Sequence, residues 1–245
     1  MQKLLVGFGV VVVVAAFVVG VYLWSERGEL GRSIVSTAPA AESAPVDTLG
    51  RSRDPNDPGE IHYKHGRYPE AIAYWTAEAA KGNAQAAHRL GVEYMDGKPG
   101  VVQRDYDKAM QYHRQAALAG NPLSMFDLGS IYEHGMGTAQ DLAQSAAWYG
   151  HSANYGLAQG QYNFATMLEV GDGVSKDEVE AYKFFILAAR GGFTGVPYDN
   201  QKLAIDKNAP MPTQLLERRL SREQITEGRR RADTFRVASG PLRIE

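Results

Sequence analysis

The sequence of 245 residues contains no cysteine. This absence excludes a disulfide framework and thiolate metal sites, but it does not identify a cellular compartment. An excess of basic charge is also missing, because 26 Lys and Arg stand against 28 Asp and Glu, for a formal net charge of −2. Since a nucleic-acid partner normally requires a basic surface, the sequence predicts none.

The common catalytic signatures are missing as well. There is no Gly-x-Ser-x-Gly, phosphate-binding loop or dinucleotide pattern. His62 and His65 are three residues apart and could share one helical face, but no third metal ligand lies near them in sequence. Asp172 and Asp177 are explained as a loop carboxylate and a helix cap. We therefore predict no catalytic residue, metal site, cofactor or small-molecule substrate, and expect that the chain is not an enzyme.

The N-terminus departs from this ordinary composition. Leu4 to Trp24 is a stretch of 21 residues without a charge, about 31 Å long as a helix and sufficient to span a bilayer. A cleaved signal peptide is the alternative, but its apolar region usually covers only about 7–15 residues. The nearest Ala-x-Ala, Ala38 to Ala40, lies fourteen residues beyond Trp24. Residues 1–32 are therefore interpreted as an uncleaved membrane anchor with its flanks.

The charges beside this span indicate its orientation only weakly. Lys3 precedes it, and Arg27 and Arg32 follow it among acidic residues. The sequence favours a short internal tail with the rest of the chain exported, as in a single-pass protein of the bacterial inner membrane whose main domain is periplasmic. An anchored domain that stays in the cytoplasm is the alternative.

A linker separates the anchor from the folded part. Residues 33–58 are rich in Pro, Ala, Ser and Asp and show no apolar periodicity. This composition predicts a flexible tether, with the folded part beginning near residue 59.

Beyond the linker, the sequence repeats itself. The segment DLGSIYEHGMGTAQD at 127–141 shares its order of apolar residues, glycines and a final aspartate with residues 89–105 and 163–177. Gly97, Gly135 and Gly171 are 38 and 36 residues apart. A second set of the form Ala-x-x-Gly keeps the same period, and its glycines are Gly82, Gly120, Gly156 and Gly192. A period of this length is typical of a helical repeat protein.

Each repeat is predicted to be a pair of antiparallel helices. Leu90 and Tyr94 are four residues apart and share one face of the first helix. The glycines at 97, 135 and 171 end the first helices, because they can adopt a left-handed backbone. Three aspartates are predicted to cap the second helices, with Gln144 and Glu180 completing capping boxes; these aspartates are Asp105, Asp141 and Asp177.

This pattern resembles the Sel-1-like repeat, a relative of the tetratricopeptide repeat, and residues 84–193 carry it three times. The unit at 59–83 is similar to the tetratricopeptide version. In the third Sel-1-like unit, Phe164-Ala165 replaces the usual Leu-Gly. Residues 194–245 are interpreted as a C-terminal capping segment, with a helix at about 221–237. The expected fold is an all-α, right-handed α–α solenoid with one N-terminal transmembrane helix.

Stacked hairpins of this kind form a curved solenoid with a concave surface. The resemblance implies that this groove is lined by positions of the first helices: Gln85, His88, Val92, Leu123, Phe126, Ser130, Glu133, Gln159, Tyr162, Thr166 and Glu169. His88, Phe126 and Tyr162 hold one equivalent position. These rings either form a ladder along the groove or pack between helices.

The resemblance implies an interaction scaffold or adaptor of the bacterial envelope that binds a protein or peptide in this groove. Together with the predicted span at 4–24, it gives a membrane-anchored scaffold. Two alternatives come from the same family. One is an immunity protein that neutralises a secreted toxin such as a phospholipase effector. The other is a hydrolase of the β-lactam-binding type, to which cysteine-rich relatives have been linked, although their disulfides have no counterpart in this chain.

Overall fold

The computed structural model describes residues 56–193 and 210–244. All of these residues belong to one compact unit, Pro45–Glu245. The predicted span at 4–24, and the linker up to residue 55, lie outside the described residues. Within 56–193 and 210–244, none of the helices has the length and apolar composition of a membrane span.

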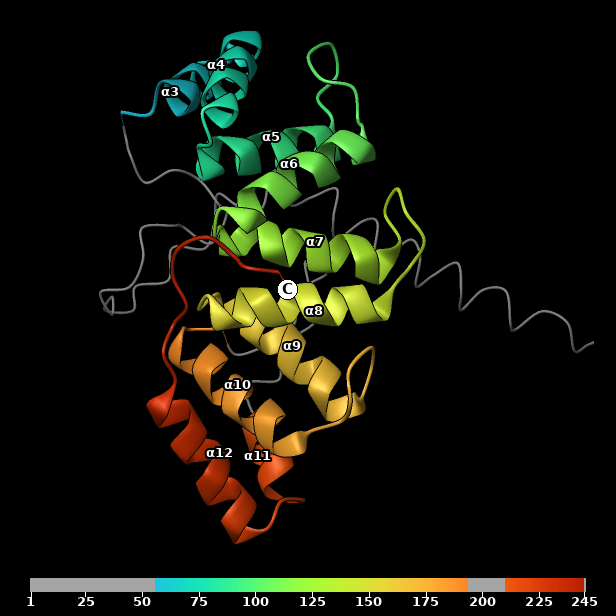
Figure 1. The fold of residues 1–245 in the computed structure, drawn as a ribbon, viewed down its shortest axis with the longest axis vertical. Helices are drawn as coiled ribbons and strands as arrows, with labels where there is room; N and C mark the ends of the chain where they lie inside the picture. The colour runs from blue at the N-terminus through green and yellow to red at the C-terminus, as the bar shows by residue number, and fades with distance from the viewer. Residues whose placement is uncertain (1–55, 194–209, 245) are drawn as a thin grey trace, which may run out of the picture. The chain divides into compact units, whose positions relative to one another are not determined.

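The described residues are helical, with one isolated bridge between Lys98 and Val102 in a loop and no strand. Figure 1 shows the helices following one another in pairs. Their bounds are α3 Pro58–Lys64, α4 Tyr68–Ala80, α5 Ala84–Asp96, α6 Tyr106–Leu118, α7 Pro122–His134, α8 Leu142–Asn154, α9 Ala158–Val170, α10 Glu178–Arg190, α11 Pro212–Glu217 and α12 Arg222–Thr234. The predicted all-α class is confirmed.

The helices pack mainly with their neighbours in sequence. The most extensive contacts lie within the hairpins α5–α6, α7–α8 and α9–α10, and further contacts join α6 to α7 and α8 to α9. The first unit, α3–α4, packs on α5, and α10 packs on α11 and α12. Each hairpin therefore buries its apolar side against the next one, which confirms the α–α solenoid.

The predicted helix caps are present at all three aspartates. The Asp105 side chain accepts a hydrogen bond from Lys108 N at 3.0 Å, and Asp141 and Asp177 act in the same way. The prediction that Gln144 and Glu180 complete capping boxes is wrong. The backbone N–H of Asp141 donates to Tyr132 O at 2.9 Å, and that of Asp177 is engaged in the same way. These N–H groups close the loop within each hairpin and leave no donor for a box.

The glycine of each Ala-x-x-Gly ends a second helix, as predicted. Gly120 has a φ of 92° and Gly156 a φ of 84°, in the left-handed region that side chains rarely adopt. Gly120 N donates to Ala117 O at 2.9 Å, and the next amide reaches one residue further back, to Ala116 O. This pairing satisfies the last carbonyl groups of the helix and turns the chain into the next hairpin.

Each hairpin is held closed by a small residue of the first helix against a ring of the second. A Cβ added at Gly91 would lie 2.7 Å from the His113 ring, and one added at Gly129 would lie 2.6 Å from the Tyr149 ring. Neither position has space for a methyl group. In α9 the equivalent position is Ala165, which is buried in one core cluster with Phe185.

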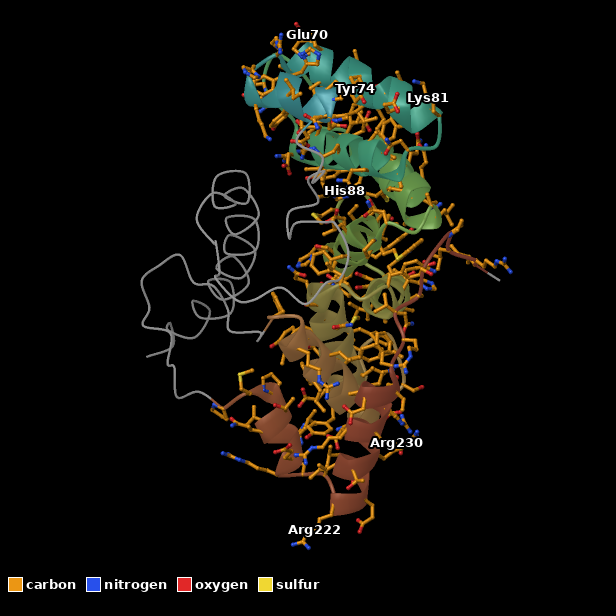
Figure 2. The ribbon with its side chains drawn as sticks, turned by 90° about the vertical axis from the view of Figure 1, so that its left-hand side faces the viewer. Glu70, Tyr74, Lys81, His88, Arg222 and Arg230 are labelled. Atoms are coloured by element: carbon orange, nitrogen blue, oxygen red, sulfur yellow. The ribbon has the colours of Figure 1, made fainter. Side chains whose placement is uncertain are left out.

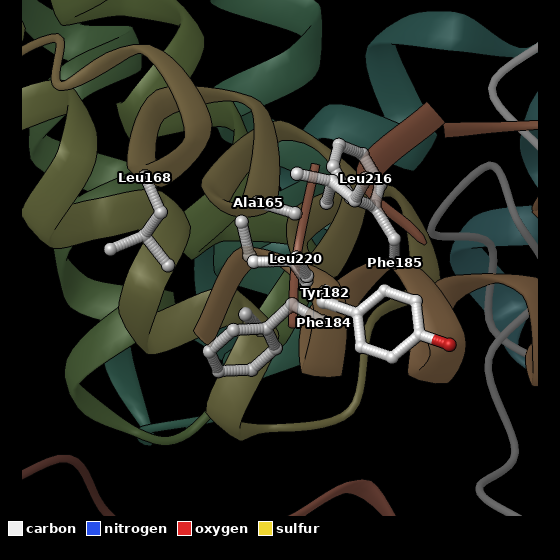
Figure 3. Packing of buried hydrophobic residues seen from close by; sticks show 9 residues of the cluster. Ala165, Leu168, Tyr182, Phe184, Phe185, Leu216 and Leu220 are labelled. Carbon is white, nitrogen blue, oxygen red and sulfur yellow. The ribbon is translucent and has the colours of Figure 1, made fainter. Parts of the chain in front are cut away.

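The C-terminal helices cover the last hairpin. Leu216 of α11 and Leu220 join Tyr182, Phe184 and Phe185 of α10 in one buried cluster (Figure 3). Ser221 and Gln224 form a capping box at the start of α12. The helix ends at Thr234, three residues before the predicted end. The capping role predicted for this segment thus has a physical basis, because it removes the exposed apolar side of α10 from water.

The contact between Gly129 and Tyr149 gives a first prediction. Gly129→Ala should destabilise the fold by about 1–3 kcal/mol, since the Tyr149 ring must move to admit the methyl group. Chemical denaturation of the purified chain measures this change. The reverse change at the equivalent position, Ala165→Gly, should cost about 1 kcal/mol through lost helix propensity. A Gly129→Ala variant as stable as the wild type would contradict this packing.

Candidate functional site

The three rings predicted to form a ladder each pair with the second helix of their own hairpin. The ring centroids of Phe126 and Tyr149 are 5.3 Å apart, and those of Tyr162 and Phe185 are also 5.3 Å apart. His88 faces His113 at 5.6 Å. The rings therefore pack between helices, which is the second interpretation of their spacing.

Two of the predicted groove residues do not reach the surface. His88, marked on α5 in Figure 2, is only 2% exposed, because it is enclosed by His113 and α7. Leu123 is 7% exposed. It holds the position of Gln85 and Gln159, which are half-buried, and its apolar side chain gains by leaving water. The expectation that His88 and Leu123 line an open groove is therefore wrong.

The other nine candidates are half-buried or exposed, and we refer to them together as the first-helix face: Gln85, Val92, Phe126, Ser130, Glu133, Gln159, Tyr162, Thr166 and Glu169. They come from α5, α7 and α9, the first helices of three successive hairpins. Thr166 is the most open of them. A binding role for this face stays a prediction.

Several polar groups of the first-helix face are already held by the protein. The Tyr149 hydroxyl donates to Glu133 Oε2 at 2.6 Å. Burial and the neighbouring Glu133 carboxylate raise the pKa of Tyr149 well above its ordinary value. Glu169 forms an ion pair with Arg219, which follows α11. These contacts fix the directions of the two carboxylates before any partner arrives.

The C-terminal tail lies on a different side of the hairpins. Ala238 N donates to Asn154 O and Leu242 N donates to Leu118 O, both at 2.9 Å. Leu118 and Asn154 are the last residues of α6 and α8. Figure 1 shows the tail running back from α12 beside α8. Among the described residues, this tail therefore covers the ends of second helices and leaves the first-helix face open.

A polar cluster that the sequence did not reveal lies between α5, α6 and α7. His88 Nδ1 and His113 Nδ1 are each 3.5 Å from Asp127 Oδ2. Ser124 Oγ lies 2.9 Å from the first of these nitrogens and 3.3 Å from the second. The predicted absence of a metal site rested on His62 and His65. The signal that we missed is that one hairpin has histidine at both positions where the next two hairpins have paired aromatic rings.

The repeat pattern agrees with a comparison against protein families. Residues 84–121, 122–156 and 151–193 match the family described as Sel1 repeat. The Sel-1-like resemblance is thereby confirmed for this part of the chain.

Individual relatives match the same region. "Chitin synthase regulator SKT5" of Saccharomyces cerevisiae is 34% identical over 83 residues, 34% of this chain and 12% of the relative. "Exopolysaccharide production negative regulator" of Rhizobium leguminosarum bv. viciae is 27% identical over 146 residues, 54% of each protein. A protective antigen of uropathogenic Escherichia coli with an SLR fold superposes with a TM-score of 0.52 at 29% identity, over 60% of this chain and 30% of the antigen. The chain thus spans about half or less of each of these proteins.

The hydrogen bond between Tyr149 and Glu133 gives a second prediction. Tyr149→Phe should lower the free energy of unfolding by about 1.5 kcal/mol, because the hydrogen bond to Glu133 is lost. This value is at the lower end for a bond to a charged group, since water can replace the tyrosine hydroxyl at the half-buried Glu133. Glu133→Gln should cost less, since its amide oxygen still accepts the bond. Chemical denaturation measures both variants.

The same contact has a pH dependence. The folded protein holds the Tyr149 proton more tightly than the unfolded chain, so this stabilisation is present below a pH of about 10 and decreases above it. Denaturation at alkaline pH should therefore show a steeper loss of stability for the wild type than for Tyr149→Phe. Parallel pH profiles for the two proteins would contradict the assignment.

Proposed function

Because residues 84–193 carry Sel1 repeats, we propose that this chain is a non-catalytic interaction scaffold. It is held to a membrane by residues 4–24 and binds a protein or peptide through the first-helix face. The observation that carries this proposal is the state of that face, which is both fixed in shape and uncovered by the C-terminal tail.

The face is pre-organised by the hairpins themselves. Phe126 and Tyr162 are each backed by a buried ring of the second helix, Tyr149 or Phe185. Glu133 is held by the Tyr149 hydroxyl. Side chains that are already ordered lose little conformational entropy when a partner binds, which favours recognition by this surface.

The position of the tail supports the same choice of surface. Its amides bond to the carbonyl groups of Leu118 and Asn154, and the Tyr155 hydroxyl donates to Gly240 O at 3.0 Å. The ends of α6 and α8 are thereby covered. Ser130 and Thr166 lie on equivalent turns of α7 and α9 and bond to His134 and to Tyr162 O of their own helices. Ser130 also bonds to Tyr149 of α8.

The names of relatives are consistent with a scaffold. Two of them are described as regulators of chitin synthase and of exopolysaccharide production, that is, as proteins that act on the activity of others. The chain spans only 12% and 54% of these two relatives, so their partners are not transferred. What we transfer is only the regulatory role that these names state, which a non-catalytic scaffold can fulfil.

A photoreactive amino acid at Ser130 or Thr166 tests the assigned surface. In native membranes, irradiation of either variant should give a discrete adduct with a partner protein. The matched controls are Gln111 and Ala147, exposed positions of the second helices that are also 36 residues apart. They should give no such adduct.

A pair of charge variants sharpens this test. Thr166→Glu should reduce the adduct formed from position 130 to background, while Ala147→Glu should leave it unchanged. Both positions are exposed, so neither change should alter stability by more than about 0.5 kcal/mol. Adducts that form from Gln111 and Ala147 alone, or an adduct that survives Thr166→Glu, would show that the first-helix face is not the binding surface.

The anchor has its own test. We propose that the chain resides in a bacterial inner membrane with its repeats in the periplasm. The full chain should then remain in the membrane fraction after alkaline extraction, and deletion of residues 4–24 should release it. An alkaline phosphatase fused to the C-terminus should be active, because this enzyme folds only outside the cytoplasm. Release of the full chain by alkaline extraction, or an inactive fusion, would contradict the proposal.

A further inference from the structure

The three Sel1 hairpins use one pair of positions in different ways. In α7–α8 the pair is Phe126 and Tyr149, and in α9–α10 it is Tyr162 and Phe185. In α5–α6 both rings are imidazoles, His88 and His113. In each of the other two hairpins, a half-buried aromatic ring packed on a buried one is sufficient. Two buried imidazoles at this place therefore require another explanation.

A third position brings a carboxylate to the same point. Fourteen residues after three of the second-helix rings, Trp75, His113 and Tyr149, a side chain of the next hairpin reaches back to that ring. Arg89 lies over the Trp75 ring at 4.6 Å, and Asn163 forms a hydrogen bond with Tyr149. Asp127 holds the equivalent place opposite His113. The repeat geometry therefore directs the Asp127 side chain toward His113, as it directs Arg89 and Asn163 toward the rings at the equivalent positions.

From this geometry we propose that His88, His113 and Asp127 form a binding site for a divalent transition-metal ion of the zinc type. One ligand atom from each of His88, His113 and Asp127 lies within 4.8 Å of the other two. The ring nitrogens that face the Asp127 carboxylate are the two Nδ1 atoms, which we take as the ligand atoms. Imidazole nitrogen and carboxylate oxygen are the ligands that such ions prefer when thiolate is absent.

The separations between each Nδ1 and the Asp127 carboxylate suit a bound ion. Both Nδ1 atoms are 3.5 Å from Asp127 Oδ2. A tetrahedral ion about 2.1 Å from each ligand separates the ligand atoms by about 3.4 Å. Ser124 Oγ, which lies within 3.3 Å of both nitrogens, can support the ligands or take a fourth coordination position.

The two imidazoles are in the protonation state that metal binding needs. Burial lowers the pKa of His113 to about 3, against a smaller opposing effect of the Gly91 backbone, and lowers the pKa of His88 well below its ordinary value. Burial thus favours the neutral form of both rings, which is the form of imidazole that binds metal ions. The Asp127 carboxylate supplies negative charge beside them.

The protein alone leaves these rings incompletely paired. His88 Nε2 and His113 Nε2 are buried and have no hydrogen-bond partner among the described residues. With a metal ion on Nδ1, each Nε2 would carry the ring proton, and the metal–ligand bonds would have to outweigh the cost of leaving that N–H unpaired. Asp127 gives access from solvent, because its side chain is 14% exposed while those of His88 and His113 are 3% and 0% exposed.

The site would join two repeats. His88 and His113 lie in α5 and α6, and Asp127 lies in α7. An ion at this point would cross-link the first two Sel1 hairpins and stabilise the folded state, since the unfolded chain does not bring these ligands together.

The test uses the full chain in detergent after removal of metals with a chelator. Titration with Co²⁺ should produce the visible absorption bands of a low-coordinate nitrogen and oxygen site, saturating at one ion per chain. Zn²⁺ should displace Co²⁺ and raise the melting temperature, while Mg²⁺ should do neither. Asp127→Asn should weaken Zn²⁺ binding by about tenfold or more, since even mutation of residues that only hydrogen-bond to metal ligands lowers metal affinity by about 10–100-fold.

The neighbouring repeats supply the matched control. The triple change His88→Phe, His113→Tyr and Asp127→Asn installs the set found at Phe126, Tyr149 and Asn163, so the chain should fold but give no Co²⁺ bands. The double change His62→Gln and His65→Gln should bind as the wild type does. The proposal fails if the wild type binds neither ion, if the triple variant binds as before, or if the His62 and His65 changes abolish binding.

Discussion

The contact on which the structure depends is that of a small residue of the first helix with a ring of the second. It occurs as Gly91 with His113 and as Gly129 with Tyr149, and the first unit uses Gly59 in the same way, since a Cβ there would collide with the Trp75 ring. The absence of a side chain allows the two helices to approach closely. Close approach buries the ring, and the buried ring then supports the residues presented on the first-helix face.

The period of the sequence was enough to predict the hairpins, the glycines that end them and the aspartates that cap them, because these features depend on local backbone chemistry. Contacts between helices were harder to predict. The capping boxes failed because the amides of Asp141 and Asp177 bond across the loop to the first helix, which no local pattern indicates. The prediction that His88 and Leu123 lie on the surface used the positions that line the groove in related repeats. Their burial depends instead on the side chains that the adjacent helices pack against them.

The histidine cluster could not be predicted from the sequence because it, too, depends on contacts between helices. His113 and Asp127 are fourteen residues apart, and only the turn between α6 and α7 brings them together. A repeat protein can vary the chemistry at one such position while the backbone stays the same, because each ring contacts only its own hairpin and the next one. One stack of hairpins can thus carry a protein-binding face on its first helices and a metal site between two of its repeats.

The central claim is that the glycine and the ring act as one unit, and a double-mutant cycle between Gly129→Ala and Tyr149→Leu measures this most directly. If the added methyl group is costly because it meets the ring, then its cost should largely disappear once the ring has been removed. We expect a coupling free energy of about 1 kcal/mol or more from chemical denaturation of the four proteins. Additive effects, within about 0.5 kcal/mol, would contradict it.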